Sequence, residues 1–225
     1  MKLTTLSAAV LAAGMMMSAA AQAEDGPFTV SGDVTMVSDY LYRGFTQTSS
    51  SPALQGTISI SHESGLYLTV WGSSIEFASG LELDPSIGYA GKAGDVEYDV
   101  GVLYYGYPGS TADEVANGSG KYDFVEFYGS VSFSGATLGL AYSPDFFGEA
   151  GDSLYLNASY GTEVSGFGLS AAVGFSTGDA YADDIIDYKV AVSKEVLGLG
   201  LELAYVGTDV DGNDEAITFA VSKSF

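Results

Sequence analysis

Apolar and polar residues alternate along most of the chain between Phe28 and Phe225. Between Val96 and Tyr104, for example, every second residue is valine or tyrosine, and Glu97 and Asp99 lie at positions between them. Alternation with a period of two predicts β-strands with one apolar face and one polar face. Most of these segments have about the length of ~9–11 residues with which a tilted strand crosses a bilayer. The twelve segments are 28–38, 54–62, 66–76, 82–91, 95–106, 121–133, 136–143, 153–162, 166–176, 185–194, 198–207 and 215–225.

The connections between these segments alternate in length along the chain. The long connections are 39–53, 77–81, 107–120, 144–152, 177–184 and 208–214. The short turns are 63–65, 92–94, 134–135, 163–165 and 195–197. Long external loops alternating with short periplasmic turns are typical of outer-membrane barrels, which have an even number of strands in bacteria. The connection 77–81 is short for an external loop and fits this pattern least well.

The sequence therefore predicts an all-β protein, a transmembrane up-and-down antiparallel β-barrel of about 12 strands. A sheet in hydrocarbon must close, because each backbone N–H and C=O group there needs a partner within the protein. A soluble β-sandwich is the alternative, since its strands also alternate, but it does not require long and short connections to alternate in phase.

The N-terminus predicts a secretory signal peptide. Lys2 precedes an uncharged, largely apolar run from Leu3 to Ala21, and Ala21-Gln22-Ala23 forms a small-x-small cleavage site. A transmembrane anchor is the alternative, because the run reaches the lower end of spanning length. We expect residues 1–23 to be the signal peptide and residues 24–225 to be an outer-membrane β-barrel. After the run, no segment has the ~20 consecutive apolar residues of a spanning helix.

Composition narrows the class of function. The chain has 30 glycines and 16 tyrosines, which suit turns and strands, and it has no cysteine. The charge is strongly negative, with 29 acidic residues against 7 basic ones, of which Lys2 would leave with the signal peptide. Nucleic acid is therefore not an expected partner, because its phosphates require basic patches.

Several charged residues fall on the polar face of the predicted strands, where they would line a pore. A charge on the opposite, lipid-facing side would cost several kcal/mol near the bilayer midplane. Carboxylates outnumber cations in this set, which favours a pore that prefers cations. A filled barrel in which these side chains bond to one another is the alternative. The predicted pore-lining residues are Asp33, Glu97, Asp99, Glu126, Asp187, Lys189 and Glu202.

The C-terminus resembles the assembly signal of outer-membrane proteins. Phe225 is the last residue, and Phe219 and Val221 occupy alternating apolar positions before it. The match is partial, because Lys223 occupies a position where an aromatic residue is common. An ordinary last strand that happens to end in phenylalanine is the alternative.

Catalytic and metal-binding residues are scarce. His62 is the only histidine, and a Ser–His–carboxylate hydrolase would need a nucleophile and an acid beside it. The predicted topology puts His62 at the periplasmic rim, and no G-x-S-x-G elbow is present. An outer-membrane hydrolase is therefore a weak alternative, and we expect His62 to be a structural residue of a turn. The acidic segment Asp209–Glu215 resembles a calcium loop but lacks EF-hand spacing, and its Asp-Gly pair is also a hairpin signal. We expect no enzyme activity, cofactor or metal.

Two blocks carry a family resemblance: SDYLYRGFTQTSSSPALQG at residues 38–56 and SHESGLYLTVWGSSIEF at residues 61–77. They resemble the TorF-type family of proteobacterial porins, also described as conserved hypothetical outer-membrane proteins. The resemblance implies an outer-membrane barrel and suggests passive transport, without naming a solute or catalytic residues. Arg43 lies in the first block. We expect its side chain to fold into the pore mouth and to pair with a carboxylate such as Asp39. The alternative is an ordinary arginine exposed on the surface.

These observations predict a porin-like channel in the bacterial outer membrane for passive diffusion of small hydrophilic solutes, with cations preferred. A non-conducting structural or partner-binding barrel is the main alternative. The expected partners are outer-membrane lipid and lipopolysaccharide, the barrel-assembly machinery, and small hydrophilic solutes or cations.

Overall fold

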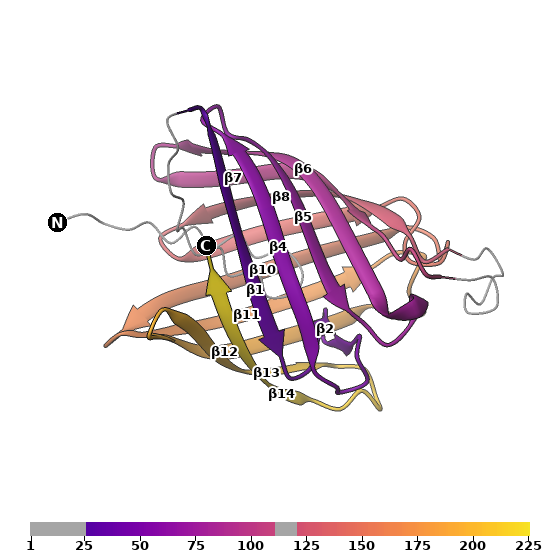
Figure 1. The fold of residues 1–225 in the computed structure, drawn as a ribbon. Coiled ribbons are helices and arrows are strands. Elements are labelled where there is room, and N and C mark those ends of the chain that lie inside the picture. Colours follow the sequence, from indigo (N-terminus) through magenta and orange to yellow (C-terminus); the bar gives the residue numbers. More distant parts are fainter. Residues whose placement is uncertain (1–25, 111–120) are drawn as a thin grey trace.

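The structure, a computed structural model, describes residues 26–110 and 121–225. Twelve antiparallel strands form a closed barrel in which neighbours in sequence are neighbours in space and the first strand pairs with the last (Figure 1). The strands are β1 (Phe28–Val37), β4 (Ala53–His62), β5 (Leu66–Ser74), β6 (Leu81–Ala93), β7 (Val96–Tyr105), β8 (Phe124–Phe133), β9 (Ala136–Ser143), β10 (Ser153–Val164), β11 (Phe167–Thr177), β12 (Ile185–Val196), β13 (Leu199–Thr208) and β14 (Ala216–Ser224).

The predicted fold class is confirmed, and each predicted segment corresponds to one barrel strand. The predicted signal peptide and most of the predicted loop 107–120 lie outside the described residues. Within the described part of the chain, none of the helical structure is long and apolar enough to cross a membrane.

Pro85 lies inside strand β6 without ending it. It faces outward and lies opposite Val70 of β5. On the other side, the pairing of β6 with β7 runs from Ser86 onward, and Leu83 makes a separate bridge to Gly106. Proline lacks the backbone N–H of a ladder bond, so the ladder has a gap here while the strand continues.

The barrel closes between β1 and β14. Asp33 pairs with Ser224 and Val37 with Ala220, and the backbone N–H and C=O groups of Gly32 each bond to Phe225 at 3.0 Å. The ring of Phe225 lies against Gly32, where a side chain would leave it no room. The last residue therefore completes the closing ladder.

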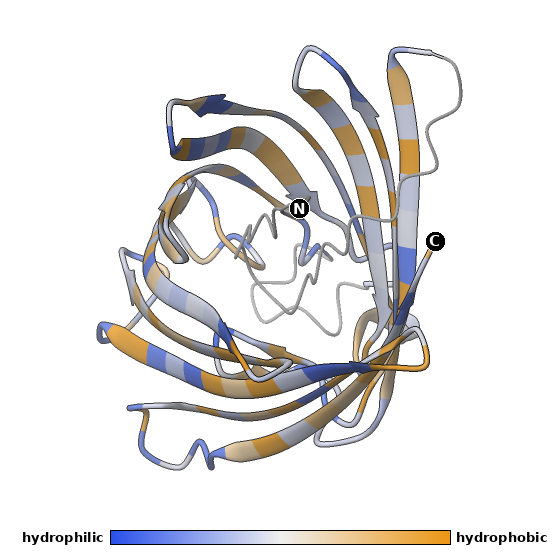
Figure 2. Cartoon of the chain, turned by 90° about the vertical axis from the view of Figure 1, so that its left-hand side faces the viewer, coloured by the Kyte–Doolittle hydropathy of each residue, from blue (hydrophilic) through white to orange (hydrophobic). Residues whose placement is uncertain are grey.

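The two faces of the sheet differ in polarity. Apolar side chains such as Val34, Ile58 and Leu138 are about half exposed on the outside, whereas the alternate positions point inward. Alternating apolar and polar bands are visible along the strands in Figure 2. Two inner-face tyrosines, Tyr67 and Tyr128, lie across glycines of the neighbouring strand. Pairs of this kind explain part of the high glycine and tyrosine content.

The connection between β1 and β4 contains a short hairpin that the alternation did not predict. It consists of β2 (Leu41–Tyr42) and β3 (Phe45–Thr46). Its two turn residues, Arg43 and Gly44, both have positive φ, at 48° and 86°, as a two-residue hairpin with a type I′ turn requires. The other described long connections include a 3-10 turn, η1 (Ala78–Gly80), between β5 and β6.

Candidate functional site

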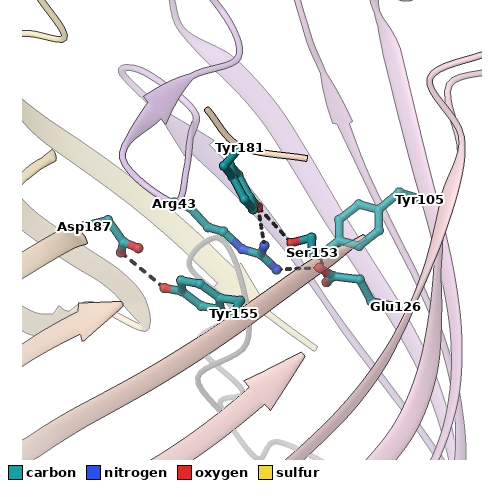
Figure 3. A network of polar contacts seen from close by, with 7 residues as sticks. All are labelled: Arg43, Tyr105, Glu126, Ser153, Tyr155, Tyr181 and Asp187. Carbon is teal, nitrogen blue, oxygen red and sulfur yellow. Dashed lines mark hydrogen bonds and ion pairs between the residues drawn. The ribbon is translucent and has the colours of Figure 1, made fainter. Parts of the chain in front are cut away.

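Arg43 lies inside the barrel at the end where the long connections gather, and several strands supply its neighbours (Figure 3). One of its guanidinium nitrogens lies 2.5 Å from Oε1 of Glu126 on β8, and the other donates to the Tyr181 hydroxyl at 3.5 Å. Tyr105 on β7 donates to the second oxygen of Glu126 at 3.0 Å. The guanidinium carbon lies 4.1 Å from the ring centre of Tyr155 on β10. The Arg43 side chain thus connects the β2–β3 hairpin to strands β8 and β10 of the barrel wall.

The tip of the hairpin is held by the connection between β13 and β14, which lies on the adjacent side of the barrel because β14 pairs with β1. Asn213 donates from its amide to the Gly44 carbonyl at 3.1 Å and to the Thr208 hydroxyl at 2.9 Å. A Cβ at Gly44 would collide with the side chain of Thr208. Glycine is therefore needed here for space as well as for its positive φ.

The surroundings of Arg43 keep it charged. Burial acts to lower the pKa of Arg43, but the oxygens of Tyr42 and Glu126 outweigh that effect, so the pKa of the guanidinium lies above its ordinary value. Burial raises the pKa of Tyr42, which keeps its phenol neutral. The Arg43–Glu126 contact is therefore a buried, charge-assisted ion pair. Asp39, the partner suggested by the sequence, instead accepts hydrogen bonds from Thr46 and Thr48.

Two more of the predicted pore-lining carboxylates, Glu202 and Glu97, also form ion pairs. Lys189 on β12 lies 2.7 Å from Glu202 on β13, in a half-buried position. Glu97 on β7 pairs at 3.4 Å with Lys92 on β6, at the end of the barrel with the short turns. These carboxylates are partly neutralised by their partners.

The remaining predicted pore-lining residues are carboxylates without a basic partner. Asp99 accepts from the Tyr67 hydroxyl at 2.8 Å, and Asp187 accepts from the Tyr155 hydroxyl at 3.2 Å. Asp33 accepts from Thr35 on the same strand. In the part of the chain that the structure describes, no lysine or arginine nitrogen lies within 4.0 Å of these three carboxylates.

Sequence reasoning missed two further carboxylates on the inner face of β6. Glu82 is 1 % exposed and accepts from the Tyr107 hydroxyl at 2.9 Å, and Asp84 is 4 % exposed and accepts from the Gly106 N–H at 3.3 Å. Their alternation with Leu81 and Leu83 was a usable signal, but the predicted segment 82–91 contains Pro85, a residue that is unusual within a strand.

An aromatic cluster fills much of the barrel interior near Arg43. The rings of Tyr105 and Phe124 stack at 4.2 Å, and Phe124 and Phe146 meet at 4.6 Å. Tyr40 packs edge-on against Trp71, the only tryptophan of the chain, with ring centres 5.4 Å apart. The sequence contained no signal for this cluster, because its members come from loops as well as from strands far apart in the chain.

A cavity of about 230 Å³ remains between the hairpin and this cluster. Seven aromatic side chains line it, among them Phe124, Phe146 and Tyr181, whereas Arg43 and two other polar residues, Gln47 and Ser176, supply the polar part. The Nε atom of Arg43 is buried and has no hydrogen-bond partner, and the same holds for the hydroxyl of Tyr42, which also lines the cavity. The cavity is therefore mainly aromatic, with unpaired polar atoms on the residues of its wall.

Other candidate residues take up structural positions. The ring of His62 lies 4.8 Å from that of Phe28, tilted by 60°, and it bonds to Ser64 in the turn after β4, away from Arg43. Among the described residues, no three histidine, cysteine, aspartate or glutamate side chains are arranged to hold a metal ion. Phe219 lies on the outside of β14, and Val221, two residues later, points to the same face.

Comparisons with known proteins show solved structures with a similar fold and identify the family of the chain. The KdgM porin in complex with disordered oligogalacturonate matches with a TM-score of 0.56 and 13 % identity, over 87 % of this chain and 98 % of that chain. A second structure, of the KdgM porin, gives a TM-score of 0.55 at 13 % identity over the same shares of the two chains. Among curated protein sequences, none matches significantly. The profile of the family described as "Bacterial protein of unknown function (Gcw_chp)" matches residues 21–225, and the chain therefore belongs to the Gcw_chp family.

Proposed function

We propose that this chain is an outer-membrane channel for passive diffusion of small hydrophilic solutes, and that it prefers cations to anions. The observation that carries the proposal is a closed barrel with apolar side chains outside and carboxylates inside. This distribution of apolar and charged side chains is the reverse of that in a soluble domain, in which apolar side chains point to the core.

The outer surface supports a place in a membrane. Large apolar side chains are exposed on every barrel strand, and the closed sheet leaves no unpaired edge. Such a surface is stable in hydrocarbon, where backbone groups must be paired, and would associate in water. We therefore propose that residues 1–23 direct secretion and that the mature chain, from Glu24, assembles in the bacterial outer membrane.

The inner wall supports a preference for cations. Arg43, Lys92 and Lys189 are each offset by a carboxylate, whereas Asp33, Asp99 and Asp187 have no such partner. Fixed negative charge in a confined aqueous pore concentrates cations and repels anions. Oligogalacturonate, named in the complex of the KdgM porin, is a chain of carboxylate-bearing sugars, and this wall would repel it. The resemblance to TorF-type porins agrees with passive transport.

A second function has one observation in its favour. The β2–β3 hairpin folds into the barrel, and Arg43 and the aromatic cluster fill space that a wide pore would leave open. A non-conducting barrel that presents its long loops to a partner would be built in this way.

Conductance measurements separate the two functions. The purified mature protein, refolded in detergent and inserted in planar bilayers, should give single-channel steps. In a KCl gradient, the reversal potential should have the sign that indicates K⁺ preference. Steps with anion preference would contradict the charge argument, and insertion without steps would favour the non-conducting barrel.

A further inference from the structure

We infer that the cavity beside Arg43 binds a neutral sugar ring of monosaccharide size. The inference rests on the proposed channel function, because it names the class of solute that the mouth of that channel recognises.

The wall is suited to a ring with flat apolar faces. The ring of Phe124 stacks on Tyr105 at 4.2 Å and meets the tilted ring of Phe146 at 4.6 Å, and Phe146 lies 5.7 Å from Tyr181. These contacts hold the aromatic faces in place before any ligand arrives. A volume of about 230 Å³ accommodates one six-membered ring with its substituents rather than an extended chain.

Unpaired polar atoms indicate that the ligand carries hydrogen-bonding groups. Arg43 Nε and the Tyr42 hydroxyl are buried without partners, although a buried polar atom that lacks a hydrogen bond costs about 1–3 kcal/mol. Gln47 and Ser176 line the same cavity. A purely apolar ligand would leave Arg43 Nε and the Tyr42 hydroxyl unsatisfied, whereas the hydroxyls of a sugar can accept from Arg43 Nε and exchange hydrogen bonds with Tyr42.

The local charges point to a neutral ligand. The charge of Arg43 is already offset by Glu126 at 2.5 Å, so a carboxylate ligand would gain little there. It would also be repelled by the carboxylate of Asp187, which has no basic partner within 4.0 Å in the described part of the chain and accepts from Tyr155 beneath the guanidinium. A cationic ligand would find no carboxylate among the described residues that line the cavity, where Arg43 is the one charged side chain. A neutral ring avoids both penalties.

Titration of the folded mature protein tests this inference with four probes of similar size. D-Glucose is the neutral ring, sorbitol is an open-chain polyol, and glucuronate and glucosamine are an anionic and a cationic ring. Isothermal titration calorimetry should show that glucose binds more tightly than each of the others. Equal binding of sorbitol, or tighter binding of glucuronate or glucosamine, would overturn the assignment.

Variants tie the binding to this cavity. Phe146→Leu removes an aromatic face and should weaken glucose binding about tenfold. Arg43→Lys keeps the positive charge but removes the Nε donor, and should weaken binding to a similar degree. Phe133→Leu makes the same change as the first variant on the exposed outer face near the short turns, and should bind glucose like the unmodified protein.

The result can be separated from that of the channel test. A protein that conducts ions but binds no glucose would overturn the sugar site and leave the channel function standing. Glucose binding that is unchanged in both cavity variants would place the sugar elsewhere and also overturn the inference. Glucose binding without conductance would support the site and contradict the diffusion channel.

Discussion

Arg43 and Glu126, which lie 83 residues apart in sequence, form an ion pair of 2.5 Å inside the barrel, and both side chains are almost fully buried. The pair connects a loop hairpin to strand β8. Removing one partner from a buried pair is costly, because the other charge remains in a poorly solvated place.

The Arg43–Glu126 pair should therefore show strong coupling. We expect Arg43→Met and Glu126→Leu each to lower the free energy of unfolding by about 3–5 kcal/mol, and the double variant to lose less than the sum. Urea unfolding of the folded protein in detergent, followed by Trp71 fluorescence, measures these values in a double-mutant cycle. Trp71 packs on Tyr40, just before the hairpin, and so reports on this region. Additive losses would show that the two charges act independently.

Neutralising inner-face carboxylates should reduce cation preference. The triple variant Asp33→Asn, Asp99→Asn and Asp187→Asn keeps hydrogen-bond acceptors for Thr35, Tyr67 and Tyr155 while removing three negative charges. The reversal potential in a KCl gradient should move toward zero. The difference from the unmodified channel should shrink as KCl rises, because the screening length falls from ~10 Å at 0.1 M to ~3 Å at 1 M.

A matched control removes the same charge from exposed positions of the long connections. Asp183→Asn, Asp184→Asn and Asp211→Asn should change the reversal potential less than the inner-face triple variant. An equal shift in the two variants would mean that the inner wall does not set the selectivity.

Deleting Phe225 should impair barrel closure. The deletion removes both backbone bonds to Gly32 and the ring that covers it. We expect a smaller fraction of heat-modifiable, folded barrel on cold gels and more aggregate in the periplasm. Phe225→Tyr keeps the bonds and the ring and should fold normally, whereas a normal yield from the deletion variant would show that β14 closes the barrel without its last residue.

The topology can be tested with epitope tags. A tag between Ala182 and Asp183, in the exposed connection before β12, should be labelled on intact cells. A tag after Gly94, in the turn between β6 and β7 where a side chain would meet open space, should be labelled only after lysis. The opposite pattern would invert the orientation of the barrel.

Processing gives a simpler test of the N-terminus. The cleavage motif Ala21-Gln22-Ala23 predicts that protein extracted from the outer membrane begins at Glu24. Intact-mass measurement would show this directly. A chain that begins at Met1 in the membrane fraction would instead support an N-terminal anchor.

The sequence by itself determined the barrel wall. A strand's side chains point alternately to its two faces, so a period of two identifies strands such as β7 and assigns Asp99 and Val100 to opposite sides without knowledge of any neighbour. Alternating connection lengths then determined the order of strands, because neighbouring antiparallel strands need only a turn or a loop between them. Even β6, with Pro85 inside it, followed this rule.

Only the tertiary structure decided what occupies the inside of the barrel. The partner of Arg43 is Glu126 rather than the nearby Asp39, because the type I′ turn at Arg43 and Gly44 directs the hairpin across the barrel. Contacts of this kind depend on the path of a loop and on strands that are distant in sequence, which no local period records. The face of each strand is a local property of the backbone, whereas the aromatic cavity exists only where the hairpin, three strands and three other long connections meet.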